Sequence, residues 1–238
     1  MNVLKWEHIV LALGVVLVAV GHTWGLAFAP AEAMMGDVGR ILYVHVPTAW
    51  VALLIFTGTF VSAIGALWTG RSGWDAGIEA TAEVGVVYNA LLLVQGSVWA
   101  RPTWGIWWTW DPRLTTTAVM ILLFIGVLVL RRVVEAPERR LTVSAIASIL
   151  AFANVPVVYF SVKWWRTLHQ DFSSPETVSN TMVSPLRIAA FGMLFLAIAL
   201  ITLRWRDIHA RLRLQTDAPA LPDLPAQLDL ATDGGTEP

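Results

Sequence analysis

The chain contains no cysteine and comparatively few charged residues. Of its 238 residues only 14% are charged, whereas a soluble domain carries about 25%. The lack of cysteine excludes disulfides, thiolate metal sites and cysteine nucleophiles. The formal net charge of −1 excludes nucleic-acid binding through bulk basicity. No G-x-x-x-x-G-K-[ST] motif occurs, so the chain does not hydrolyse ATP through a phosphate loop of that kind.

Apolar residues, in contrast, are abundant and fall in long runs. They make up 56% of the chain, and six runs have the length that a bilayer-spanning helix needs, about 17–25 residues. The runs are 9–28, 46–68, 78–99, 114–130, 143–162 and 186–203. Because lipid cannot satisfy backbone polar groups, segments this long are helices and not barrel strands. The sequence predicts an all-α integral membrane protein with six transmembrane helices.

Basic residues predict the orientation of the spans, because cytoplasmic segments carry an excess of lysine and arginine. The larger set comprises Lys5, Arg71, Arg131, Arg132, Arg139, Arg140, Arg204, Arg206, Arg211 and Arg213. The smaller set, on the opposite side, comprises Arg40, Arg101, Arg113, Lys163, Arg166 and Arg187. Both termini are therefore expected in the cytoplasm.

This orientation divides the chain into two parts. Residues 1–213 are expected to form the membrane domain, with outer loops at 29–45, 100–113 and 163–185. Residues 214–238 are rich in Asp, Pro, Ala and Gly. Such a composition predicts a disordered cytoplasmic tail.

Tryptophan is frequent, with 13 residues, and it is concentrated in the second outer loop. This loop holds Trp104, Trp107, Trp108, Trp110 and Asp111 and is flanked by Arg101 and Arg113. If the segment is a helical turn, Trp104, Trp107 and Trp108 share one face. An interfacial aromatic belt explains one or two tryptophans per span end. A flat apolar platform with basic edges, suited to a carboxylate-bearing planar ligand such as a porphyrin, explains the cluster equally well.

Three histidines, His22, His45 and His169, are predicted at or near the outer face. Neutral imidazole is the usual protein ligand of haem iron, and two histidines from separate loops can hold iron from opposite faces. Any single interfacial histidine is more simply explained as a polar group reaching toward water. Spacing alone does not choose among the three.

Other polar residues near the outer face have two interpretations each. Arg101, Arg113, Arg166 and Arg187 are candidates for pairing with porphyrin propionates or with lipid headgroups. Asp111 precedes Pro112, an arrangement typical of a helix N-cap. Asp111 is therefore a candidate both for capping the fourth span and for contact with the ligand.

Three polar residues within the spans are interpreted as contacts between helices, and one proline is interpreted as the cause of a kink. Asn89, Gln95 and Asn154 are expected to hold helices together, and Pro156 to kink the fifth helix.

Several stretches together resemble the haem exporter protein C (CcmC) family of tryptophan-rich haem-handling proteins. They are GSVW at 96–99, WGIWWTWD at 104–111, RLT at 113–115, FAPA at 28–31, YVHVP at 43–47, SVKWWRTLHQ at 161–170 and SPLR at 184–187. By position, His45 and His169 match the family's histidines, whereas His22 falls in no motif.

The resemblance implies a multi-pass protein of the bacterial inner membrane that is not itself an enzyme. It implies that haem b is held on the periplasmic side by the tryptophan loop, with His45 and His169 as axial ligands. It further implies transfer of the haem to the periplasmic haem chaperone CcmE. The implied partners in an ABC-type complex are the ATPase subunit CcmA, the membrane subunit CcmB and the small single-span subunit CcmD.

Three alternatives compete with this interpretation. A haem lyase or cytochrome c synthase shares the tryptophan-rich loop, but such proteins are longer and carry further spans. A transporter that moves haem through its own spans needs polar groups near the membrane midplane, and those present form no evident path. A purely structural subunit uses its tryptophans only as a belt.

Overall fold

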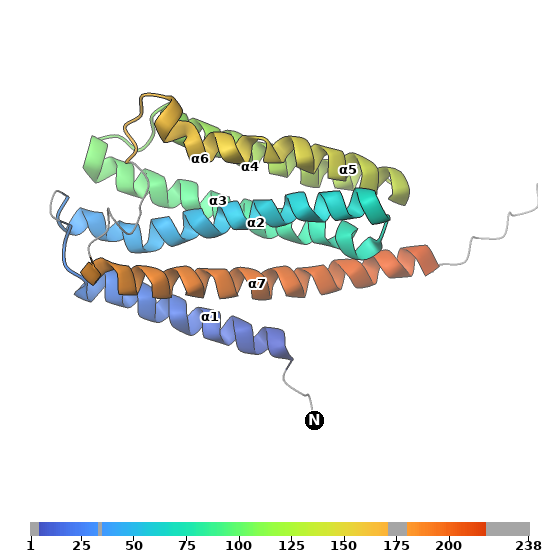
Figure 1. Cartoon of the computed structure of the whole chain (residues 1–238), viewed down its shortest axis with the longest axis horizontal. Coiled ribbons are helices and arrows are strands. Elements are labelled where there is room, and N and C mark those ends of the chain that lie inside the picture. Colours follow the sequence, from blue (N-terminus) through green and yellow to red (C-terminus); the bar gives the residue numbers. More distant parts are fainter. Residues whose placement is uncertain (1–4, 33–34, 171–179, 218–238) are drawn as a thin grey trace, which may run out of the picture.

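The computed structural model describes residues 5–32, 35–170 and 180–217, which form a bundle of helices (Figure 1). Six helical segments are long and apolar enough to cross a membrane: Trp6–Phe28, Asp37–Thr69, Ser72–Trp104, Pro112–Val133, Pro137–Trp164 and Thr181–Gln215. Each contains one of the six predicted runs. The prediction of an all-α membrane protein with six spans is therefore confirmed.

The spans are built from nine helical elements in the described part of the chain. They are α1 (Trp6–Thr23), the π-helical turn η1 (Trp24–Phe28), the 3-10 turn η2 (Asp37–Ile41), α2 (Leu42–Thr69), α3 (Ser72–Trp104), α4 (Pro112–Val133), α5 (Pro137–Phe152), α6 (Asn154–Trp164) and α7 (Asn180–Asp217). α1 lies against α7, α2 and α3 occupy the middle, and α4 to α6 cover the other side (Figure 1).

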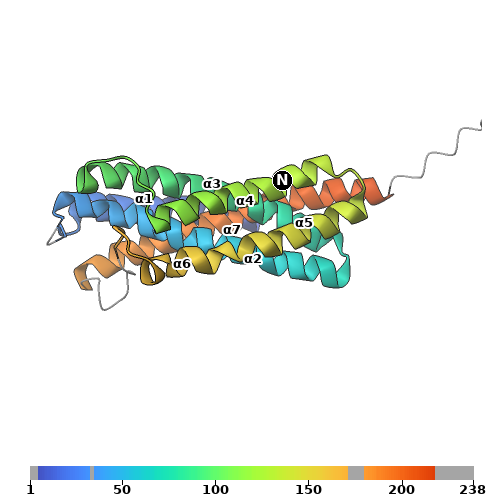
Figure 2. The same cartoon turned by 90° about the horizontal axis from the view of Figure 1, so that it is seen from above.

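The helices run along one common axis, as the perpendicular view also shows (Figure 2). Successive spans alternate in direction, so the bundle has two ends. The histidine end carries residues 24–32, 35–45, 100–112 and 164–170. The arginine end carries residues 5–7, 69–75, 131–140 and 204–217. α7 continues past Arg213 to Asp217, and the rest of the expected tail, 218–238, lies outside the described residues.

Glycines allow α1 to pack closely on α7. The buried residues of α1 are Glu7, Gly14 and Gly21, spaced by seven so that they share one helix face. A Cβ at Gly21 would lie 2.5 Å from the Ala189 backbone nitrogen, and one at Gly192 would lie 2.6 Å from that of Val18. Small residues at such contacts let membrane helices approach and gain van der Waals contact.

The fifth span is interrupted where Pro156 was expected to kink it. α5 ends at Phe152 and α6 begins at Asn154, because Pro156 has no N–H with which to continue the helical ladder. Asn154 Nδ2 donates to the Thr116 carbonyl of α4 at 2.9 Å. The predicted kink and the packing role of Asn154 are both confirmed.

Asn89 of α3 makes a similar contact with α4, one residue further along that helix. Its Nδ2 donates to the Thr117 carbonyl at 3.0 Å, and its side chain is fully buried. The predicted packing role is confirmed for Asn89. It is not confirmed for Gln95, whose buried Oε1 has no hydrogen-bond partner among the described residues.

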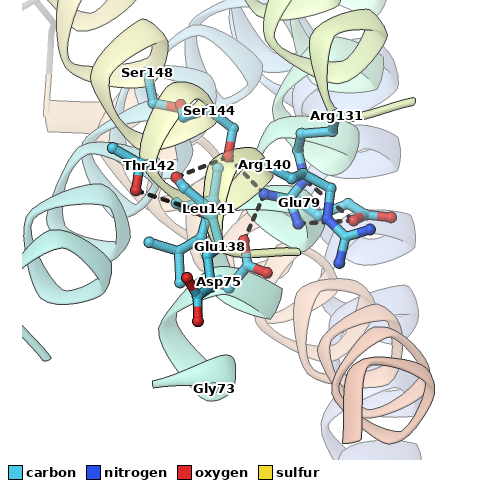
Figure 3. A network of polar contacts seen from close by, with 12 residues as sticks. Gly73, Asp75, Glu79, Arg131, Glu138, Arg140, Leu141, Thr142, Ser144 and Ser148 are labelled. Carbon is cyan, nitrogen blue, oxygen red and sulfur yellow. Dashed lines mark hydrogen bonds and ion pairs between the residues drawn. The ribbon is translucent and has the colours of Figure 1, made fainter. Parts of the chain in front are cut away.

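A buried ionic network joins the helices at the arginine end (Figure 3). Arg131 of α4 contacts Asp75 at 2.6 Å and Glu79 at 3.0 Å, both on α3. Its Nη1 also donates to Ser144 Oγ of α5 at 2.8 Å. Glu79 accepts a further bond from Arg211 of α7 at 2.5 Å. Charges buried this deeply are stable only when they are paired, and here each carboxylate has an arginine.

Two further ion pairs extend the network along the bundle. Arg204 of α7 holds Glu83 of α3 through two bonds of 2.7 and 3.1 Å. Arg206 of α7 pairs with the buried Glu7 of α1. The acidic residues at the start of the third span therefore serve to bind neighbouring helices.

Candidate functional site

Two of the predicted histidines face one another at the histidine end. His45 lies in α2 and His169 in the segment that follows α6, and their ring centroids are 6.5 Å apart with the ring planes tilted by 38°. α2 begins at Leu42, so the last residues of the expected outer segment 29–45, His45 included, are helical. Tyr43 and Val46 are buried in a cluster with Met182 and Leu186 of α7, which stabilises this turn as helix.

The separation of the two rings suits a metal ion held between them. Metal–imidazole bonds of about 2.0 Å, with each ring centre about 1.1 Å behind its ligating nitrogen, give a centroid separation of about 6.2 Å. The observed 6.5 Å is close to that value. The tilt is compatible with ligation, because each imidazole can rotate about its own metal–nitrogen bond.

The surroundings of His169 favour the neutral form of its imidazole, which is the form that binds a metal. Its Nδ1 lies 2.8 Å from the Gln170 carbonyl oxygen. This contact favours a proton on Nδ1 and leaves the lone pair on Nε2, as second-shell partners of ligating histidines do. Burial lowers the pKa of His169 below its ordinary value; the Gln170 carbonyl opposes this shift, and the charge of Arg113 adds to it. The net lowering of the pKa favours the neutral ring, the form that binds a metal.

His45 is packed between two residues of α3. Its ring contacts Trp99 edge-on, with centroids 5.4 Å apart, and its Nδ1 is buried without a hydrogen-bond partner among the described residues. A Cβ at Gly96 would lie 3.3 Å from His45 Cε1, so a larger side chain there would press on the ring. Glycine at position 96 therefore leaves the space that the imidazole occupies.

The two histidines line a largely apolar pocket between α2, α3, α4 and α6. The lining residues are His45, Val46, Ala49, Trp50, Leu53, Leu92, Leu93, Gly96, Trp99, Ala100, Thr103, Trp104, Arg113, Leu114, Thr117, Met120, Val158, Tyr159, His169 and Gln170. Apolar walls with a few converging polar groups are typical of sites for cofactor-sized ligands.

Asp111 links the start of α4 to the segment that carries His169. Its Oδ1 accepts from the Arg113 backbone N–H at 2.9 Å, which confirms the predicted N-cap. Its Oδ2 accepts from Thr167 Oγ1 at 2.6 Å and from the Leu168 N–H at 2.7 Å. The carboxylate is buried, so these charge-assisted bonds position the residues that immediately precede His169.

The tryptophan loop is not the helical turn that its spacing allowed. Gly105 adopts a φ of +79°, a left-handed conformation that ends α3 at Trp104. Trp104 lines the pocket. Trp107 and Trp110 instead stand exposed, at 59% and 80% of their surface, and Trp108 contacts Trp110 edge-on with centroids 5.9 Å apart. Trp104, Trp107 and Trp108 therefore do not share a helical face.

A second group of exposed aromatic side chains lies at the end of α6. Phe160 stacks on Trp164 with centroids 5.4 Å apart, and Trp164 meets Trp165 edge-on. Because Asp111 ties the segment after α6 to the tryptophan loop, both exposed aromatic groups adjoin the same end of the bundle. The end of the bundle that holds the pocket therefore carries exposed aromatic side chains from two segments.

Of the four candidate arginines, Arg113 alone is among the pocket residues, and the two that flank the tryptophan loop are placed differently. Arg113 lines the pocket, and its Nη2 donates to the Tyr159 carbonyl at 3.1 Å. Arg101 is exposed on the last turn of α3, where its side chain bonds the Gly105 carbonyl. His22, the third candidate histidine, lies on α1 and is not among the pocket residues.

Gly96, Trp99 and Trp50 are pocket residues that were not predicted as site residues. Gly96 and Trp99 of α3 could have been found from the sequence. Leu92, Gly96, Trp99 and Thr103 recur at helical spacing and so share one face. Steps of four, three and four residues back from Thr103 reach Trp99, Gly96 and Leu92 in turn. Trp50 follows His45 at i+5 and carries no comparable signal.

These features define a class: a multi-pass helical membrane protein with two facing histidines in an apolar, aromatic-rich pocket at one end of its bundle. Comparison with known families identifies the family to which the chain belongs. Residues 2–219 match the family described as Heme exporter protein C, and the chain belongs to that family.

Individual relatives agree with this assignment. The chain is 37% identical over 198 residues to Heme exporter protein C of Escherichia coli (strain K12), covering 82% of this chain and 80% of the relative. It is 32% identical over 218 residues to the protein of that name from Bradyrhizobium diazoefficiens, covering 89% and 81%. The Rhodobacter capsulatus protein is 32% identical over 219 residues, with 88% of each chain covered.

Proposed function

We propose that this chain holds haem b between His45 and His169 at the extracytoplasmic face of the bacterial inner membrane. From there it passes the haem to the periplasmic chaperone CcmE for cytochrome c maturation. The observation that carries the proposal is the 6.5 Å separation of two neutral-ligand candidates across an apolar pocket. Family membership supports haem as the cargo.

The chain acts in this proposal as a haem-transfer subunit and not as an enzyme. It has no phosphate-binding loop, so ATP hydrolysis belongs to a separate subunit, CcmA. CcmB and CcmD complete the proposed complex within the bilayer. The excess of basic residues at the arginine end supports a cytoplasmic position for that end, which places the histidine end outside.

Each part of the site has a distinct role in the proposed complex. The histidines bind the iron, and the exposed tryptophans Trp107 and Trp110 support the ring where it leaves the pocket. Arg113, beside the pocket, is the better placed of the two arginines for a propionate. Trp104 contacts the ring from inside the pocket, Trp108 supports Trp110, and Arg101 lies at the outer edge.

The alternative in which haem crosses through this chain receives less support. Asn89 and Asn154, polar groups inside the spans, both donate to backbone carbonyls of α4. They thus hold helices together.

Haem reconstitution followed by chaperone addition tests the proposed function. The purified full chain, titrated with haem, should give a six-coordinate low-spin absorption spectrum. Adding the purified soluble domain of CcmE should then move haem from this chain to the chaperone. A chain that gives no low-spin species would contradict the haem site, and one that binds haem but never transfers it would contradict the role in delivery.

Asp111→Asn is expected to speed haem dissociation. The amide keeps the shape of the side chain but has one accepting oxygen in place of two and carries no charge. It cannot keep the Arg113 cap together with the bonds to Thr167 and Leu168, and the bonds that remain are weaker, so the segment before His169 is held less firmly. A hydrogen bond to a charged group contributes about 1.5–3 kcal/mol, so we expect a rise in the haem dissociation rate of roughly 10–150-fold. Transfer of haem to apomyoglobin measures this rate.

Asp37→Asn is the matched control for that variant, because Asp37 is exposed at the same end and pairs only locally with Arg40. It should release haem at the wild-type rate. An Asp111→Asn protein that keeps both the wild-type dissociation rate and the low-spin spectrum would show that Asp111 does not position His169.

Gly96→Val is expected to weaken haem binding by pushing His45 from its position. The added Cβ would lie 3.3 Å from the ring, and valine adds two methyl groups beyond it. Overpacking of this kind costs about 1–3 kcal/mol, which corresponds to roughly a 5–150-fold loss of affinity in a haem titration. Gly126→Val is the control, since a Cβ there meets nothing within 4 Å. Equal affinities for the two variants would contradict the steric role of Gly96.

A further inference from the structure

A second pocket lies at the arginine end, far from the histidines. It is formed where the turn between α2 and α3 meets α7. Arg71 and Arg213 line it together with Trp74, Trp205 and His209. The proposed handling of haem at the histidine end does not use this pocket.

The two arginines of this pocket differ in pairing from four neighbouring arginines of α4 and α7. Arg131, Arg204, Arg206 and Arg211 each contact a carboxylate of α1 or α3. Arg71 and Arg213 form no ion pair with the described residues. The pocket therefore presents two cationic groups whose charge no described carboxylate neutralises.

The pocket walls are held in place by the protein's own contacts. Trp205 Nε1 donates to the Gly73 carbonyl at 2.7 Å, which fixes α7 against the first turn of α3. The Trp205 and His209 rings lie 4.7 Å apart, one helical turn from each other on α7. Basic side chains are thus set beside rigid aromatic surfaces, a combination that suits an anion attached to an apolar body.

Exposed tryptophans place this pocket at the level of the lipid headgroups. Trp6, Trp68 and Trp74 lie at the arginine ends of α1, α2 and α3 and are 50%, 86% and 40% exposed. Tryptophans at span ends settle in the interface between hydrocarbon and water. An anion reaching Arg71 and Arg213 at this depth comes most readily from the membrane itself.

We propose that this pocket binds the phosphate group of an anionic phospholipid. Arg71 and Arg213 bind the phosphate, and the acyl chains leave along the exposed faces of Trp74 and Trp68. Basic pockets between membrane helices are known to take anionic headgroups in this way. The proposal is independent of the haem site, which lies at the other end of the bundle.

Lipid binding by native mass spectrometry of the full chain tests the proposal. The probes are dioleoylphosphatidylglycerol, dioleoylphosphatidylcholine and inorganic phosphate, each added to the delipidated protein. We compare the wild type with Arg71→Gln/Arg213→Gln and with the control Arg132→Gln/Arg139→Gln. The control removes two exposed arginines from the same end but outside the pocket.

We expect the wild type and the control to retain phosphatidylglycerol in preference to phosphatidylcholine. The pocket variant should lose this affinity by about tenfold or more, since each arginine near a membrane surface adds attraction for an anionic lipid. Its low-spin haem spectrum should stay unchanged, which shows that the protein is folded.

Three results would overturn the proposal. The pocket variant and the wild type could bind phosphatidylglycerol equally. The control could lose as much affinity as the pocket variant, which would mean diffuse attraction. Inorganic phosphate could compete with the lipid at equal concentration, which would make the ligand a free phosphate.

Discussion

Replacing either His45 or His169 by alanine is expected to abolish the six-coordinate low-spin haem spectrum. Each variant leaves the iron one protein ligand, so the haem becomes high-spin or dissociates. Because the histidines would bind the metal directly, the loss of affinity should exceed the roughly 10–100-fold that removing a second-shell partner costs. Absorption and electron paramagnetic resonance spectra of the reconstituted protein measure both changes.

His22→Ala is the matched control, since His22 belongs to the same end of the bundle but does not line the pocket. It should give the wild-type spectrum. Added imidazole should restore low-spin haem in the two pocket variants by replacing the missing ligand. If either variant keeps the wild-type spectrum without imidazole, that histidine is not an axial ligand.

The largest effect on stability is expected from Arg131→Met. This change leaves Asp75 buried without its arginine and removes one of the two arginines that hold Glu79. Removing one partner of a buried pair costs about 3–5 kcal/mol, because the remaining charge stays buried and unpaired. Thermal unfolding in a fixed detergent should show a large decrease in the midpoint temperature.

Two further variants separate pairing from packing. Arg132→Met changes the neighbouring exposed arginine and should leave the unfolding midpoint nearly unchanged. Adding Asp75→Asn to Arg131→Met should recover part of the lost stability, because it removes the unpaired charge. If Arg131→Met and Arg132→Met unfold at the same temperature, the network contributes little to stability.

The fold could be predicted almost entirely from the sequence, because a bilayer imposes simple requirements on length and polarity. Even the interruption of the fifth span followed from Pro156, and the start of α4 from Asp111 and Pro112. The pairing at the arginine end could not be predicted. Glu79 meets Arg131 and Arg211 only because three helices pack together there, and spacing along one helix does not reveal its neighbours.

The site could be predicted in part. Composition and charge directed attention to the tryptophan loop and to three histidines, but resemblance to a family was needed to select His45 and His169. The loop geometry was not predictable from spacing, since the left-handed Gly105 decides where α3 ends. The second role of Asp111, in anchoring the residues before His169, depends on a contact across more than fifty positions of the chain.

The decisive experiment for the proposed site is a haem-bound structure of the full chain. We expect iron between His45 and His169, with each iron–nitrogen distance about 2 Å, the scale of metal–imidazole bonds. We also expect the ring edge to lie against Trp104 and to extend toward Trp107 and Trp110. Haem stacked on the exposed tryptophans with neither histidine bound to its iron would contradict this assignment of the ligands.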